Sequence, residues 1–105
     1  MDHERTFTMS EIIGKKAFSA DNIPLGKITK IIDQSDREQD DPNKLCDIEK
    51  DLFQVVVELT PDIFPELSEP TEILFSSQTL SKVVEDGIQL KLQKETISAT
   101  LKRSL

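Results

Sequence analysis

The segment Leu52–Leu59, LFQVVVEL, constrains the fold more than any other part of the chain. Its apolar and polar side chains alternate, which is the period-2 pattern of a strand with one buried face. The residues on its apolar face are Phe53, Val55, Val57 and Leu59. A strand of this kind is stable only when further strands and a packed layer cover that face. The chain is therefore expected to build a β-sheet.

Four other segments have strand character. They are Lys15–Ser19, Leu25–Ile32, Thr71–Ser76 and Gly87–Leu92. The Asp, Asn and Pro of residues 21–24 predict a turn that joins the first two into a hairpin. Residues 77–86 are expected to form a helical turn or a short connector.

The second of these strands has an irregular alternation. Ile28 and Ile31 are separated by an odd number of residues, so a regular strand would place them on opposite faces. The spacing predicts either a β-bulge or a strand that is buried on both sides. Gly14, Gly26 and Gly87 are expected to serve tight bends or close approaches of the backbone, although simple turn glycines would suit an all-β domain equally well.

Together these segments predict an all-β domain, a small and mostly antiparallel barrel of about five or six strands with a short C-terminal helix. Barrel closure would remove exposed strand edges. The helix is indicated by Ile97, Leu101 and Leu105, which follow one another at four-residue spacing and form one apolar stripe. A helix this short is marginal alone, so its stripe must pack on the chain's own barrel or on a second subunit.

Charge is concentrated in one segment. The chain has 13 basic and 20 acidic residues, which gives 13 − 20 = −7, and residues 33–51 hold eight acids and three bases, which gives −5. We expect a flexible N-terminus at 1–9, a barrel domain at 10–94 with an acidic loop insertion at 33–51, and the helix at 95–105. An acidic chain is a poor ligand for nucleic acid, because that affinity comes mainly from Lys and Arg.

The acidic segment places Asp36, Glu38 and Asp40 at the first, third and fifth positions of a calcium loop. The sixth position requires Gly and the twelfth a bidentate Glu, whereas Asp41 and Asp47 stand there. The segment therefore predicts a solvated loop without a metal ion.

The reactive side chains are few. His3 and Cys46 are the only His and Cys, which excludes an internal disulfide and falls short of the ligands of a structural zinc site. No Gly-rich phosphate loop or nucleophile elbow is present. The longest apolar runs are three residues, too short to span a membrane. We therefore expect a cytoplasmic, non-enzymatic protein with no cofactor.

Residues 60–70 contain three prolines and the apolar side chains of Ile63, Phe64 and Leu67. Prolines lower the entropy lost when a loop docks, so these side chains are candidates for a partner surface. They are equally suited to cap one end of a barrel. The candidate interface residues, for a partner or for a dimer, are Ile63, Phe64, Leu67, Ile97, Leu101 and Leu105.

The stretch Ile12–Ile32, IIGKKAFSADNIPLGKITKII, resembles the opening of the PRC-barrel family, which is named for the photosynthetic reaction centre H subunit and includes a domain of the ribosome maturation factor RimM. The apolar pair, Gly and basic residue of that pattern fall at 12–15, and its apolar-Gly-basic-apolar motif falls at 25–28. Ile73–Leu92 resembles the second half of the pattern. The resemblance covers roughly residues 10 to 94 and departs at 33–51 and 60–70.

The resemblance implies a PRC-type barrel. Stand-alone barrels of this size are similar to archaeal proteins of FtsZ-based cell division, which bind the membrane-linked anchor SepF. It therefore implies a homodimeric adaptor that binds a SepF-type protein, without nucleic acid and without inserting into a membrane. The alternative is a ribosome-assembly factor of the RimM type. A small-ligand binder or enzyme would require a deep polar pocket.

Overall fold

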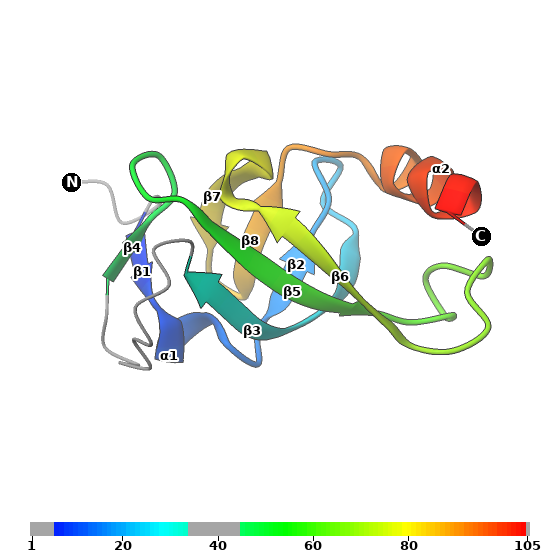
Figure 1. Ribbon diagram of the computed structural model, residues 1–105, viewed down its shortest axis with the longest axis horizontal. Helices are drawn as coiled ribbons and strands as arrows, with labels where there is room; N and C mark the ends of the chain where they lie inside the picture. The colour runs from blue at the N-terminus through cyan, green and yellow to red at the C-terminus, as the bar shows by residue number, and fades with distance from the viewer. Residues whose placement is uncertain (1–5, 34–44, 105) are drawn as a thin grey trace.

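The computed structural model describes residues 6–33 and 45–104 (Figure 1). The chain forms, in order, β1 (Thr6–Thr8), α1 (Met9–Ile12), β2 (Lys16–Phe18), β3 (Pro24–Asp33), β4 (Leu45–Asp47), β5 (Phe53–Leu59), β6 (Thr71–Ser76), the 3-10 helix η1 (Ser77–Thr79), β7 (Leu80–Val84), β8 (Gly87–Leu90) and α2 (Lys94–Ser104). The candidate calcium ligands Asp36, Glu38 and Asp40, together with Asp41, lie outside the described residues. No helix in the described part is long and apolar enough to cross a membrane.

Six strands form one sheet in the order β6-β5-β3-β2-β8-β7. The expectation of a β-rich domain with a C-terminal helix is confirmed. The sheet is mixed, because β2 runs parallel to β8 while the other neighbours are antiparallel. It is also not closed into a barrel, because β6 and β7 lie at its two edges. The parallel pair joins segments that are about 70 residues apart in the chain, and strand alternation carries no information about such pairing.

The sheet folds over so that β3, β5 and β6 cross β2, β8 and β7, with the core between the two layers (Figure 1). The apolar face of β5 is buried in this core, as its alternation predicts. The register of β3 against β5 shifts between Ile28 and Lys30, so the expected bulge is present, with Thr29 as the additional residue. Because of the bulge, Ile28 and Ile31 are both buried.

A second, two-stranded sheet covers one end of the core. β1 pairs with β4, which places Phe7 opposite Cys46, and both side chains are buried. The Phe7 ring also meets the Phe53 ring edge to face, with 5.7 Å between centroids. Residues 6–9 are thus ordered rather than part of a flexible terminus. Likewise, residues 45–51 of the expected acidic loop carry a strand and a turn.

The connector expected at residues 77–86 is mostly a strand. η1 occupies three residues, and β7 then pairs with β8. The short alternation of β7 is obscured by a register shift between Leu80 and Lys82, which explains why the sequence pattern does not reveal it.

Two glycines allow the strands to approach one another. A Cβ on Gly26 would overlap the backbone carbonyl of Glu58 on β5, and a Cβ on Gly87 would overlap that of Lys16 on β2. Gly87 also has φ of +155°, which disfavours other residues, and Gly14 has φ of +96°. The glycines therefore hold the pairs β3–β5 and β2–β8 together, in addition to shaping turns.

Candidate partner-binding surface

The proline-rich segment closes one end of the core. The backbone N–H groups of Ile63 and Phe64 both donate to the Thr60 carbonyl, at 3.1 and 2.9 Å, which turns the chain inward. Phe64 is then fully buried, Leu67 is 6% exposed and Ile63 is half-buried against the core. In this conformation Phe64 and Leu67 belong to the core of their own chain, and Ile63 packs against that core while remaining partly exposed.

The C-terminal helix packs in the same region. Ile97 and Leu101 are buried in the core, and Leu105 lies outside the described residues. Figure 1 shows α2 beside the loop that joins β5 and β6, and the Ser98 hydroxyl of α2 donates to the Glu66 carboxylate of that loop. Ile97 and Leu101 of the apolar stripe are thus covered by their own chain.

The carboxylates of Glu66 and Asp21 form hydrogen bonds that tie α2 to the β5–β6 loop and to the β2–β3 turn. The Ser98 hydroxyl lowers the pKa of Glu66 because it stabilises the ionised carboxylate. The Ser19 hydroxyl lowers the pKa of Asp21 in the same way, and Asp21 also accepts from the backbone N–H of Lys94 at 3.4 Å. Asp21 is exposed and Glu66 is half-buried, and their partners identify them as anchors of the β2–β3 turn and of α2.

The side of β3, β5 and β6 that faces away from the core also carries apolar side chains. Val56 lies directly opposite Leu74 of β6, and Lys30 of β3 is its partner on the other side. Ile32 of β3 lies opposite Gln54, so it shares this side. We call the set Ile32, Val56 and Leu74 the outer apolar face.

The exposure of this face is unusual for the molecule. Ile32 is 38% and Leu74 is 49% exposed, and they are two of the four exposed large apolar side chains among residues 6–33 and 45–104. Val56 is 4% exposed although it does not belong to the core cluster. Its neighbours on the sheet surface therefore cover it, and the face has a packed centre with exposed apolar flanks.

Charged side chains border the outer apolar face at one end. Lys27, Glu58 and Glu72 lie in one row across β3, β5 and β6. The Thr29 hydroxyl of the bulge lies over β5, at 3.3 Å from a Glu72 carboxylate oxygen and 3.4 Å from the Val56 carbonyl. The bulge thus fixes the Glu72 side chain beside the apolar centre.

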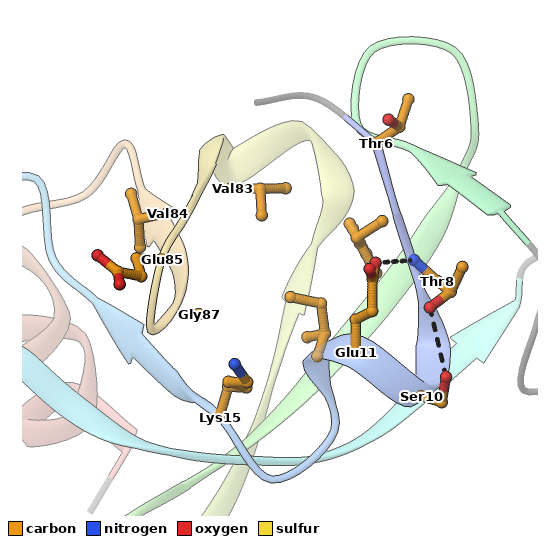
Figure 2. A pocket seen from close by; sticks show the side chains of 11 residues that line it. Thr6, Thr8, Ser10, Glu11, Lys15, Val83, Val84, Glu85 and Gly87 are labelled. Carbon is orange, nitrogen blue, oxygen red and sulfur yellow. Dashed lines mark hydrogen bonds between the residues drawn. The ribbon is translucent and has the colours of Figure 1, made fainter. Parts of the chain in front are cut away.

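A cleft of about 520 Å³ lies between α1 and the β7–β8 turn (Figure 2). Its polar lining includes Lys15, Glu85 and Glu11, and the Glu11 carboxylate accepts from the backbone N–H of Thr8 at 2.9 Å. Glu85 belongs to the β7–β8 turn, and Figure 2 shows it apart from Glu11. Glu11 therefore serves the start of α1, and no nucleophile with an adjacent base is assembled by these lining residues. Within the described ranges, no three His, Cys, Asp or Glu side chains are grouped to hold a metal ion.

The lysines of the first hairpin are spread along it. Lys16 and Lys27 are directly opposite each other in the β2–β3 pair, and both are exposed. They flank a shallow hollow of about 320 Å³ that includes Leu25 and Ile63 in its lining. Lys16 and Lys27 thus bring two cations together on this side of the sheet, and Glu58 of β5 lies opposite Lys27 on its other side.

The candidate interface residues inferred from the sequence do not include the outer apolar face. A signal for it is present, however. Uninterrupted apolar runs such as Val55–Val57, Ile31-Ile32 and Ile73–Phe75 necessarily put apolar side chains on both faces of a strand. One member of each run therefore points away from the core, and in this fold all three meet on one side.

No protein-family model, no curated protein and no solved structure matches this chain.

Proposed function

We propose that this chain is a non-enzymatic protein–protein interaction module, related to PRC-barrel proteins although its sheet is open, that works as a homodimeric adaptor. The observation that carries the proposal is the outer apolar face of Ile32, Val56 and Leu74. Exposed apolar side chains that gather on one face of a small domain are typical of a surface that binds another protein.

The composition of the surface supports this assignment. Protein interfaces combine an apolar centre with a polar, solvent-accessible rim. Here the centre is bordered by Lys30 on one flank and by the row of Lys27, Glu58 and Glu72 at one end. The mixture of both signs favours a partner that offers apolar side chains flanked by charges of both signs.

The partner class comes from the resemblance to PRC-barrel proteins. We propose that the outer apolar face binds a SepF-type division protein in an FtsZ-based assembly. A rigid sheet suits such a role, because little conformational entropy is lost when a preformed surface docks.

Calorimetric titration of the full chain with the SepF-type protein of the same organism tests this proposal. We expect Ile32→Lys to weaken binding at least about tenfold, because it buries an unpaired charge in the interface. Ile13→Lys is the matched control, because Ile13 is similarly exposed at 44% but lies after α1 and outside the outer apolar face. Absence of binding by the unaltered chain, or equal binding by both variants, would refute the proposal.

The alternative of a RimM-type assembly factor draws support from one observation, the opposed pair Lys16 and Lys27. It predicts that ribosomal particles retain the protein at low salt and release it as salt rises. Loss of retention in a Lys16→Ser, Lys27→Ser double variant, with no binding to a SepF-type protein, would favour this alternative.

A further inference from the structure

The two edges of the six-stranded sheet are built differently. Edge strands commonly carry features that discourage pairing with another chain, such as bulges, prolines and lysines. β7 has two of them, a register shift between Leu80 and Lys82 and the exposed Lys82 itself. These two features discourage the β7 edge from pairing with another chain.

β6 has almost no such protection. Its six residues, TEILFS, pair with β5 without any register shift, and they contain neither proline nor lysine. The only charged residue is Glu72. Within the described part of the chain, β5 is the only strand beside it. The outer edge of β6 therefore offers a regular row of backbone donors and acceptors to another strand.

We propose that a second copy of this chain occupies that edge, with the two β6 strands antiparallel and Leu74 on the two-fold axis. This inference rests on the proposed function, because it names the route by which the adaptor becomes a dimer. A two-fold contact must use the same surface on both copies, so the strand must be complementary to itself.

The Leu74-centred register satisfies this requirement. Leu74 faces Leu74 of the second copy, which pairs two side chains that are 49% exposed in the single chain. Glu72 faces Ser76 of the second copy, so a carboxylate meets a hydroxyl donor. On the core side, Ile73 faces Phe75 of the second copy. Opposed aromatic and β-branched residues stabilise antiparallel pairs, and like charges directly opposite destabilise them.

Other registers are poorer. A pairing centred on Ile73 sets Glu72 against Leu74 of the second copy, which removes a carboxylate from water without a donor. A pairing centred on Glu72 opposes two like charges. Of these three registers, the Leu74-centred one satisfies both the charged and the apolar side chains.

In this dimer the two partner-binding surfaces face the same direction. Opposed residues in an antiparallel pair point to the same side of a sheet. The two outer apolar faces would then lie side by side on one continuous surface, with both Leu74 side chains at its centre. The dimer would present two copies of the partner site in one direction.

Sedimentation equilibrium of the full chain tests the proposal. Ser76→Asp places a second carboxylate opposite Glu72 at both symmetry-related contacts, and we expect the dimer dissociation constant to rise about 2- to 30-fold. Ser76→Asn is the matched control. Ser76 accepts from the backbone N–H of Gln78 at 3.2 Å as the N-cap of η1, and Asp and Asn both retain that cap. Ser81→Asp makes the same charge change on β7 and should leave the dimer intact.

A double variant with reversed charge tests whether the dimer can be restored. Glu72→Lys combined with Ser76→Asp restores opposite charges across the contact, so the double variant should recover the dimer that Ser76→Asp weakens. A chain that is monomeric at every concentration, or a dimer that Ser76→Asp does not weaken, would overturn the β6 contact.

Measurement of partner binding distinguishes failure of the β6 contact from failure of the proposed adaptor function. Calorimetry with the SepF-type protein should still detect binding by a monomeric Ser76→Asp chain, and Ile32→Lys should still weaken it. Retained dimerisation without any partner binding would instead refute the adaptor role alone.

Discussion

At the scale of single residues, the hydroxyls of two buried serines form hydrogen bonds with backbone groups in the turns of the sheet. The Ser77 hydroxyl donates to the Asp51 carbonyl at 3.1 Å and accepts from the backbone N–H of Phe53 at 3.3 Å, which ties η1 to the start of β5. Ser19 is also fully buried, and its hydroxyl accepts from the backbone N–H of Ile23 at 3.0 Å. Both serines satisfy backbone groups that the sheet leaves without strand partners.

Replacement of Ser77 should therefore be costly. In Ser77→Ala the backbone groups of Asp51 and Phe53 lose their partner in a buried setting, and we expect a loss of about 1–3 kcal/mol in the free energy of unfolding. Urea denaturation followed by circular dichroism measures this change. The exposed Ser81 offers the control, because Ser81→Ala should change stability by less than about 0.5 kcal/mol. Equal stability of the two variants would contradict the assigned role.

The hydrogen bond from Ser98 predicts a local dependence on pH. The pKa of Glu66 is lowered in the folded state, so this contact contributes stability above the ordinary carboxyl pKa and loses it as the pH falls through the folded value. In Ser98→Ala the pKa of Glu66 should rise towards its ordinary value, as measured by NMR titration of the side-chain carboxyl. An unchanged Glu66 pKa in this variant would show that Ser98 is not its main partner.

At the scale of elements, sequence and structure agree where a pattern is local. Thr71–Ser76 has the predicted bounds as β6, and β3 and β5 differ from prediction by single residues at their ends. The bulge at Thr29 was detectable because it breaks an alternation. β1, β4 and β7 have three to five residues each and were not predicted, because so few positions carry little alternation. β2 is as short, but the turn residues at 21–24 mark it as one arm of a hairpin.

Leu101 of the C-terminal helix α2 is buried in the core, so its contribution to stability can be measured. Leu101→Ala removes buried methyl groups and leaves a cavity, so we expect a loss of about 2–5 kcal/mol in the free energy of unfolding. Thr96→Ala, at an exposed position of the same helix, is the control and should change stability by less than about 0.5 kcal/mol. A small effect of Leu101→Ala would indicate that α2 is not docked in solution.

Close strand approach at Gly26 leads to a sharper prediction. In Gly26→Ala the new methyl group would overlap the Glu58 carbonyl, so β3 and β5 would have to separate in the middle of the sheet. We expect a loss of more than about 4 kcal/mol, in the exceptional range for one substitution. Amide exchange of β5 reports the same change as a loss of protection. Wild-type stability of Gly26→Ala would contradict the described β3–β5 register.

At the scale of the whole molecule, one apolar cluster connects the six-stranded sheet, the small β1–β4 sheet and α2. Cys46 and Phe7 belong to it at one end, and Ile97 and Leu101 at the other. A cluster shared by all elements favours a single cooperative unfolding transition.

Cys46 provides the test of this cooperativity. It is the only cysteine of the chain and is 3% exposed, so a thiol reagent should label it only as the protein unfolds. The urea dependence of labelling should coincide with the loss of circular dichroism. Labelling at urea concentrations where the circular dichroism is unchanged would show that the small sheet opens separately.

Local patterns in the sequence predict the β-rich class, the buried face of β5, the bulge of β3 and the C-terminal helix. Each of these follows from the spacing of apolar residues within a few positions of one another. Local patterns do not predict that β2 and β8 run parallel, that β6 and β7 lie at open edges, or that Phe64 and Ile97 enter the core while Leu74 stays outside. Those features depend on which distant segments pair, and local alternation describes a strand's faces without naming its neighbours.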